Sequence, residues 1–249
     1  IGMARIVNQE EHTAKRNEIL DVAQQLIDTI GYERMTIQDI LDKLQISKGA
    51  LYHYFDSKPA LLEALTQRMV IEYEQALLPI IHDLDLSALE KLQRVFLTVI
   101  RSKATQRTFV AALLRVWYTD DIAIVGQKVD EALMSRLVPL LALTIRQGTQ
   151  EGVFTPAYPD HISDVIWSLL RGLQETPARL LLAYAPEQDE QQYIETVISV
   201  HTAYMDTLER ILGIPSGSLY RADAETVKGW VTALRSNVQS SSEPLPPNQ

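Results

Sequence analysis

The stretch that decides the fold is residues 36–58, which read TIQDILDKLQISKGALYHYFDSK. Thr36 is a good N-cap for a short helix that ends near Leu44, because its hydroxyl can accept a hydrogen bond from a free backbone amide of the first turn. Ser47 can cap a second short helix that runs to Phe55. Two short helices joined by a tight turn have the dimensions of a helix-turn-helix, in which the second helix enters the major groove of DNA.

The outward face of the second helix carries an unusual set of side chains. Leu51 and Phe55 stand four residues apart and turn inward together, which leaves a cation, two small residues, two phenols and an imidazole outside. A solvated face without a function would be filled with Glu, Lys and Gln. The groups found here can instead bind phosphates and base edges. The outward positions are Lys48, Gly49, Ala50, Tyr52, His53 and Tyr54.

Residues 36–58 resemble the DNA-binding signature of the TetR family of one-component transcriptional regulators. The likeness extends upstream through the first predicted helix to Gly31 and Tyr32 and downstream to Leu62, and it covers about the first quarter of the chain. The resemblance implies a homodimer with an N-terminal three-helix DNA-binding domain and a variable helical domain that binds a small ligand. The family's contact positions fall on Thr36, Gln38, Lys48, Gly49, Ala50, Tyr52, His53, Tyr54 and Lys58, and Ser47 completes the predicted DNA-binding set.

Two features depart from the family pattern. Gln45 stands where the family usually has Gly in the turn, and Leu41 and Leu44 replace small residues of the preceding helix. We therefore expect Gln45 to adopt the turn with some backbone strain. The crossing angle of the two helices is also expected to differ.

The charge balance argues against strong non-specific DNA binding. The formal net charge of the chain is −9, so any DNA-binding surface must be a local patch. Within residues 31–58 the cations Arg34, Lys43, Lys48 and Lys58 are balanced by Glu33, Asp39, Asp42 and Asp56. Further positive charge comes from Arg5, Lys15 and Arg16. We expect weak non-specific binding.

The composition favours an all-α protein with a sizeable core. Hydrophobic residues make up 46% of the 249 residues, whereas 10 Gly and 11 Pro are too few for the turns of a β-sandwich or barrel. The absence of Cys excludes disulfides, a thiolate nucleophile and a Cys-ligated zinc site. No apolar run approaches the roughly 20 residues needed to cross a bilayer. We expect a cytoplasmic protein with no membrane partner.

Helical periodicity continues almost to the end of the chain. We expect a helix-turn-helix DNA-binding domain at residues 1–58, a helical-bundle ligand-binding and dimerisation domain at 59–239, and a flexible tail at 240–249, which is rich in Ser and Pro. The helices are expected near residues 13–30, 36–44, 47–55, 59–82, 87–104, 106–118, 121–149, 160–184, 188–212 and 223–237.

Large aromatic residues gather in the helical runs of the second domain. For each one alone, core packing is the ordinary explanation. Together with the family resemblance they favour a mainly apolar ligand pocket with a few polar contacts, and we expect Arg171 to be an interior cation. The predicted pocket residues are Phe96, Phe109, Trp117, Tyr118, Met134, Trp167 and Arg171. Pro139 and Pro177 are expected to kink their helices and to open space between them.

The sequence therefore predicts a ligand-responsive DNA-binding transcriptional regulator, a repressor released from operator DNA by a small molecule. The broad apolar faces of residues 162–184 and 193–212 predict a homodimer, as similar helices form the dimer interface in the family. No catalytic residue, metal site or cofactor is predicted, because His82, His161 and His201 stand alone and no phosphate-binding loop is present. Two alternatives stay open: a helical enzyme or ligand carrier, and an interaction adaptor that has the fold without specific DNA binding.

Overall fold

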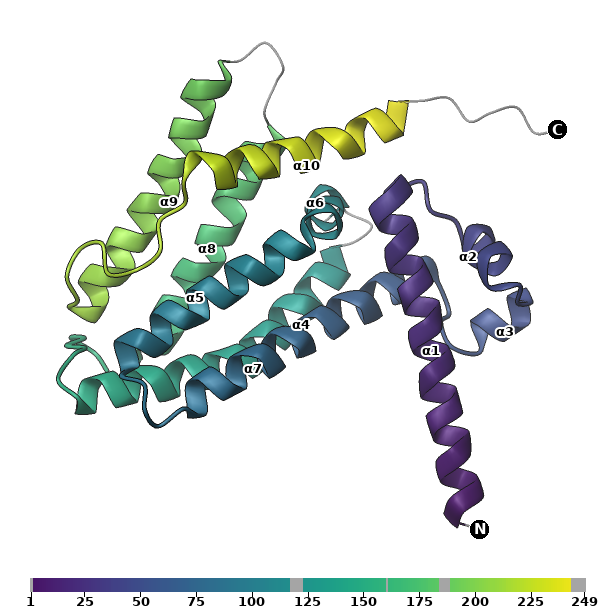
Figure 1. The fold of residues 1–249 in the computed structure, drawn as a ribbon, viewed down its shortest axis with the longest axis horizontal. Helices are drawn as coiled ribbons and strands as arrows, with labels where there is room; N and C mark the ends of the chain where they lie inside the picture. Colours follow the sequence, from purple (N-terminus) through teal and green to yellow (C-terminus); the bar gives the residue numbers. More distant parts are fainter. Residues whose placement is uncertain (1, 117–122, 160, 184–188, 243–249) are drawn as a thin grey trace. The chain divides into compact units, whose positions relative to one another are not determined.

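All regular structure in the described part of the chain is helical. The computed structural model describes residues 2–116, 123–159, 161–183 and 189–242 (Figure 1), and these residues contain no strand. The helices are α1 (Gly2–Ile30), α2 (Ile37–Leu44), α3 (Lys48–Tyr52), α4 (Lys58–His82), α5 (Ala88–Thr105), α6 (Arg107–Val116), α7 (Ala123–Gln150), α8 (Ile162–Leu182), α9 (Glu190–Leu212) and α10 (Ala224–Ser242).

The prediction of an all-α fold is confirmed, with corrections at some helix ends. The first helix begins well before the predicted residue 13, and the second helix of the helix-turn-helix ends at Tyr52 rather than Phe55. The carbonyl of Leu51 accepts hydrogen bonds from the amides of both Tyr54 and Phe55, so the helical hydrogen bonding ends in a tightened last turn at these residues. Pro139 and Pro177 lie inside α7 and α8, as predicted.

The chain divides into two compact units. Unit 1 comprises residues 1–69, 108–129 and 236–249, and unit 2 comprises residues 70–107 and 130–235. The boundaries predicted at residues 58 and 239 do not coincide with these divisions and remain predictions. Ser240, Ser241 and Ser242 of the predicted flexible tail belong to the last turn of α10, and residues 243–249 lie outside the described residues.

Unit 1 is organised by α1, which packs on α2 (Figure 1). Ile19, Ala23 and Ile27 of α1 are buried at helical spacing, and Gly31 ends the helix with a φ of +82° that a side chain would strain. The start of α2 carries a reciprocal capping box between Thr36 and Asp39. The three helices α1 to α3 thereby present the helix-turn-helix on a closed apolar core.

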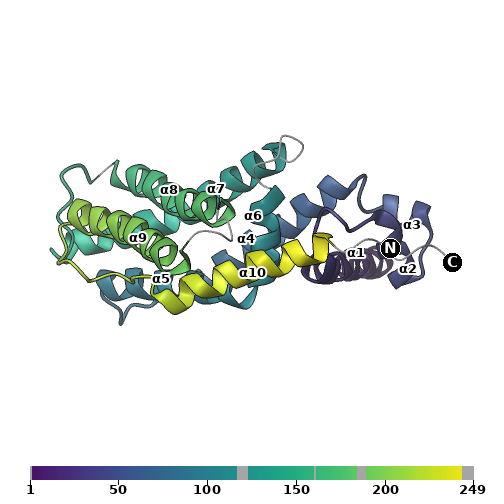
Figure 2. The same ribbon diagram turned by 90° about the horizontal axis from the view of Figure 1, so that it is seen from above.

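Unit 2 contains α8 and α9 side by side (Figures 1 and 2), and a core cluster joins them to α5 and α7. Leu92 of α5, Ile166 of α8 and Met205 of α9 are buried in this cluster. A second cluster joins Leu77 and Ile81 of α4 to α7 and α5. These contacts make unit 2 a bundle with its own core.

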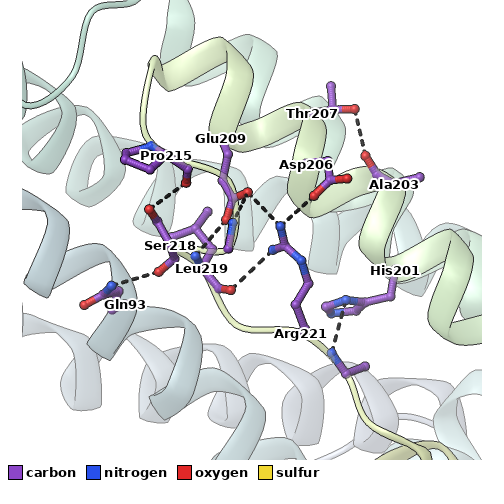
Figure 3. A network of polar contacts seen from close by, with 12 residues as sticks. Gln93, His201, Ala203, Asp206, Thr207, Glu209, Pro215, Ser218, Leu219 and Arg221 are labelled. Carbon is purple, nitrogen blue, oxygen red and sulfur yellow. Dashed lines mark hydrogen bonds and ion pairs between the residues drawn. The ribbon is translucent and has the colours of Figure 1, made fainter.

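The segment between α9 and α10 is tied to α9 by an ionic network (Figure 3). Glu209 is 1% exposed, and its carboxylate accepts hydrogen bonds from the amides of Gly217 and Leu219 and from Arg221. Arg221 also binds Asp206 at 2.6 Å. Burial opposes the charged form of Glu209, but these hydrogen bonds outweigh that effect and hold its pKa below the ordinary value. The network thus satisfies a buried charge and orders the connection to α10.

Candidate nucleic-acid interface

The core-facing side of α3 anchors the helix, and its other side is exposed. Leu51 is fully buried and Phe55, just beyond the helix, is 4% exposed, as the spacing predicts. Ser47 caps the helix by accepting a hydrogen bond from the amide of Ala50 at 3.2 Å. Apolar burial on one side and a capped N-terminus therefore hold a five-residue helix in place although it is too short to be stable alone.

The exposed side of α3 carries the residues predicted to contact DNA. Lys48, Gly49, Ala50, Tyr52 and His53 are exposed, and Tyr54 is half-buried. A Cβ placed on Gly49 would meet only Ser47 Oγ, 4.0 Å away. The surface over Gly49 and Ala50 is therefore open to a close-approaching backbone.

Lys48 and Tyr52 form a pair one helical turn apart. The Lys48 ammonium lies 5.7 Å from the centroid of the Tyr52 ring, and the Tyr52 side chain keeps 40% of its surface accessible. Such a cation–π contact at an exposed site holds the ammonium only weakly. Lys48 is thus free to reorient toward a phosphate or a guanine edge.

The N-terminal helix adds an aromatic neighbour to this surface. The ring of His12 in α1 lies 4.6 Å from that of Tyr54 and 5.6 Å from that of His53, measured between centroids. The rings of His53 and Tyr54 are 5.3 Å apart. His12 therefore packs against His53 and Tyr54, the two aromatic residues that directly follow α3.

His12 is not among the residues that the sequence predicts to contact DNA, although the sequence held a signal for its position. His12 lies seven residues before the buried Ile19, which places both on one face of α1. Arg16, about one turn further along this face, lies over the ring of Phe55 with its guanidinium carbon 5.0 Å from the centroid. Lys15 instead pairs with Glu18 at 2.7 Å.

Two of the predicted DNA contacts, Thr36 and Gln38, already have hydrogen-bond partners within the protein. Thr36 exchanges capping hydrogen bonds with Asp39, so its hydroxyl is engaged in the capping box. Gln38 donates from Nε2 to Asp42 at 2.7 Å. Both of these side chains shape α2 and must break or share a hydrogen bond in order to reach DNA.

Lys58 at the start of α4 is held more firmly. Its ammonium donates to the carbonyl of Glu33 at 3.1 Å and lies 4.4 Å from the centroid of the Tyr32 ring. Burial lowers the pKa of Lys58, and the negative charges of Glu33 and Asp39 partly oppose that shift. Lys58 therefore joins the start of α4 to the turn after α1, and stabilising that junction is one of its roles.

The turn of the helix-turn-helix has the strained backbone that the sequence predicts. Gln45 has a φ of 52°, the left-handed region, and is the one non-glycine residue with positive φ in the described part of the chain. Its Nε2 donates to the carbonyl of Asp42 at 2.6 Å, and its amide donates to the carbonyl of Leu41. These hydrogen bonds compensate in part for the absence of Gly at this position.

The segment that contains the helix-turn-helix is similar in sequence to known bacterial regulators. A sequence model described as "Bacterial regulatory proteins, tetR family" matches residues 19–65, from the buried half of α1 into α4. KstR2 of Mycobacterium tuberculosis (strain CDC 1551 / Oshkosh), named as an HTH-type transcriptional repressor, is 26% identical over 211 residues, which cover 79% of this chain and 96% of that protein. Residues 19–65 are thus similar to the TetR family of regulators.

Other curated proteins match over shorter segments. The A-factor receptor protein of Streptomyces griseus is 42% identical over 59 residues, which cover 23% of this chain and 21% of that protein. The chain spans less than half the length of the first curated relatives that it matches.

Solved structures of regulators share the fold. A transcriptional regulator from Cytophaga hutchinsonii superposes with a TM-score of 0.55 at 17% identity and covers 80% of this chain and 98% of its own. RolR without ligand gives a TM-score of 0.53 at 17% identity, with 92% of this chain and 97% of RolR covered. The chain thus shares with these structures a fold in which an N-terminal helix-turn-helix is followed by a helical C-terminal part.

The residues predicted to form a ligand pocket differ in burial and belong to different units of the structure. Phe96 and Trp167 are half-buried in unit 2, whereas Phe109 is buried in unit 1. Trp117 and Tyr118 lie outside the described residues. The pocket as a whole remains a prediction.

Two of the predicted pocket residues are exposed in the single chain. Met134 keeps 48% of its surface accessible. The prediction that Arg171 is an interior cation is wrong for the single chain: its side chain is 56% exposed and lies 3.7 Å from Glu175, one turn along α8. Apolar neighbours in the sequence suggested burial, but the helix turns Arg171 outward.

Proposed function

We propose that this chain is a DNA-binding transcriptional regulator that acts as a homodimer and releases its operator when a small molecule binds. The observation that carries the proposal is the exposed face of α3. This face consists of Lys48, Gly49, Ala50 and Tyr52, and the buried Leu51 anchors the helix from its other side. The names of the KstR2 relatives support repression as the mode of regulation. We propose the cytoplasm as the place of action.

A binding titration with duplex DNA tests the proposal directly. The probe is a fluorescent duplex from the intergenic region beside the chain's own gene, and its binding is followed by fluorescence anisotropy. The bound probe is then challenged with the same excess of unlabelled operator DNA or of unlabelled random DNA. We expect competition by the operator alone, because the balanced charge of the domain gives little non-specific attraction. Equal competition by random DNA contradicts sequence-specific regulation, and no binding at all favours the adaptor alternative.

A homodimer is the assembly that the proposed mechanism needs. A two-fold dimer presents two copies of α3 to half-sites roughly 34 to 36 Å apart, about one turn of B-DNA. In support, Val165 of α8 is exposed, and Leu180, Leu181 and Ile198 on α8 and α9 are only half-buried in the single chain. Sedimentation at micromolar concentration is expected to give twice the mass of the chain, and a monomer would contradict binding to paired half-sites.

Regulation by a small molecule requires that the ligand prefer the conformation that does not bind DNA. A typical coupling free energy of about 1 to 3 kcal/mol lowers operator affinity about 5- to 150-fold. By reciprocity, operator DNA lowers the affinity for the ligand by the same factor. Titration of tryptophan fluorescence with and without operator measures this, and equal ligand affinities would show that the ligand does not control DNA release.

A further inference from the structure

Two imidazoles from different helices of unit 1 meet beside the recognition helix. His12 belongs to α1, and His53 directly follows α3. Their ring centroids lie 5.6 Å apart, and the two ring planes are at 80° to each other. The ring of Tyr54 contacts both, with its centroid 4.6 Å from that of His12 and 5.3 Å from that of His53. We call His12 and His53 the imidazole pair.

The imidazole pair is accessible, and its ring nitrogens are not engaged by the protein. His53 is exposed and His12 is half-buried. Within the described part of the chain, neither imidazole makes a hydrogen bond or an ion pair, and both have only the ring contacts given above. An imidazole can donate one hydrogen bond when neutral and two when charged. The pair can therefore offer its donors to another molecule.

No carboxylate of the described residues holds the imidazole pair in a charged state. The charged and titratable side chains near the pair, on α1 and on the segment from α3 to the residue after Phe55, are Glu11, Lys15, Arg16, Lys48, Tyr54 and Asp56. Lys15 is paired with Glu18, and neither Glu11 nor Asp56 forms an ion pair with an imidazole. A negatively charged ligand is therefore the group that can stabilise a charged imidazole at this position.

The imidazole pair lies at the end of α3 that is opposite to Lys48. In a helix-turn-helix the N-terminal residues of the second helix contact base edges in the major groove. Because α3 has only five residues, His53 is within about 7.5 Å of that end and lies toward the rim of the groove, where the phosphates run. The N-terminal half of α1 runs past α3 at the same place (Figure 1). His12 thus joins this rim, although it precedes the segment 19–65 that matches the family model.

We propose that the imidazole pair binds a phosphate group of the DNA backbone and takes up a proton from the solvent when DNA binds. The inference rests on the proposed DNA binding, because its ligand is a part of the duplex. A protonated imidazole donates a charge-assisted hydrogen bond to a phosphate oxygen. The negative phosphate also offsets the repulsion between positive charges that lie this close together. DNA and the proton therefore strengthen each other's binding, and DNA affinity rises as the pH falls through the range in which histidine titrates.

Anisotropy titrations between pH 8 and pH 6 test this inference on the full chain. The probes are the fluorescent intergenic duplex and a random duplex of the same length, both at low salt. The unmodified chain is expected to bind about tenfold more tightly at pH 6 than at pH 8. His12→Phe keeps the ring contacts, so it is expected to match the unmodified chain near pH 8 and to lose most of the gain at pH 6. His161→Gln, at an exposed histidine of unit 2, should keep the gain.

Calorimetry separates proton uptake from a purely structural role of the rings. DNA binding is measured at pH 6.5 in two buffers that differ in ionisation enthalpy, and the difference in heat gives the number of protons taken up. The unmodified chain is expected to take up about 0.5 to 1 proton, and His12→Phe and His53→Gln close to none. A structural role would lower affinity equally at every pH and leave the proton number unchanged. Two single variants keep the inference testable if one of them fails to fold.

The outcomes distinguish this inference from the proposed function. The same pH dependence and proton number in the unmodified chain, His12→Phe and His53→Gln would overturn the phosphate site. If both duplexes bind equally and proton uptake depends on the imidazole pair, the phosphate site is supported and sequence-specific regulation is contradicted. Specific binding of the intergenic duplex without that proton uptake would do the reverse. Failure of the unmodified chain to bind either duplex would contradict both.

Discussion

The ammonium of Lys58 lies 4.4 Å from the centroid of the Tyr32 ring and also donates to the backbone carbonyl of Glu33. Lys48 has its cation–π contact with Tyr52 at the greater distance of 5.7 Å, on an exposed surface. Two lysines that look equivalent in the sequence therefore serve differently: one is part of the junction between α1 and α4, and the other is available to DNA.

Replacement of these lysines separates stability from DNA binding. Lys58→Ala is expected to lower the free energy of unfolding by about 1 to 2 kcal/mol, because a cation–π contact and a hydrogen bond are lost. Lys48→Ala is expected to leave stability within about 0.5 kcal/mol and to reduce the salt slope of operator binding by about one unit. Urea unfolding and salt titrations measure the two effects, and an unchanged slope in Lys48→Ala would remove this residue from the DNA-binding face.

The ring contacts of His12 predict an effect on operator binding. His12→Ala is expected to weaken operator affinity about two- to tenfold, since Tyr54 and His53 lose the aromatic neighbour that orients them. His12→Phe keeps a ring at the position and should retain most of the affinity. His161→Ala serves as the control because His161 is exposed and makes no capping hydrogen bond. Equal affinities of the Ala variant and the unmodified chain would show that the ring contacts have no positioning role.

The left-handed backbone at Gln45 predicts opposite effects of two substitutions. Gln45→Gly removes the steric cost of a φ of 52° and is expected to raise the free energy of unfolding by up to about 1 kcal/mol. Gln45→Val places a β-branched residue there and is expected to lower it by about 1 to 2 kcal/mol. Denaturant unfolding of both variants measures the difference, and the same stability for Gly and Val would argue against strain in this turn.

The network around Glu209 predicts unequal contributions from the two carboxylates that bind Arg221. Glu209→Gln is expected to cost about 3 kcal/mol, because it weakens a buried, fully hydrogen-bonded carboxylate site. Asp206→Asn is the matched control and is expected to cost about 1 kcal/mol or less, since the Asp206 side chain is 34% exposed. Thermal or urea unfolding provides the measurement, and equal costs would mean that burial of Glu209 adds nothing.

Acid sensitivity is expected from His201. Burial and the positive charge of Arg221 lower the pKa of His201 to about 4, whereas the pKa of a His in the unfolded chain is about 6.5. Between these values the unfolded chain binds a proton that the folded chain does not, so stability falls as the pH drops from about 6.5 to about 4. The pKa of Glu209 is lowered as well, and its contribution is lost only in more acidic solution.

His201→Gln tests this assignment, because Gln does not titrate and can still accept the hydrogen bond from the amide of Ala222. The fall in stability between pH 6.5 and 4 is expected to be shallower in the variant than in the unmodified chain. His161→Gln, at an exposed position, should leave the pH profile unchanged. Parallel profiles for His201→Gln and the unmodified chain would assign the acid sensitivity to other groups.

The sequence by itself determined the elements of the DNA-binding domain and the exposed face of α3. The signals are local: Thr36 and Ser47 cap the helices that follow them, Gly31 ends α1, and the spacing of Leu51 and Phe55 turns one face inward. Each of these effects acts within about four residues, so a reader of the sequence can follow it. The left-handed turn at Gln45 was predicted from the family resemblance, because Gln45 stands where the family usually has Gly.

Only the tertiary structure decided which polar side chains have partners. His12 meets Tyr54 across 42 positions of the chain, Lys58 meets Glu33, and Lys103 meets Gln174 on a distant helix. Arg171 turns outward although its sequence neighbours are apolar. Helical periodicity states which residues share a face but not which other helix covers that face. The burial and charge of such groups depend on contacts between remote segments, and folding alone brings those segments together.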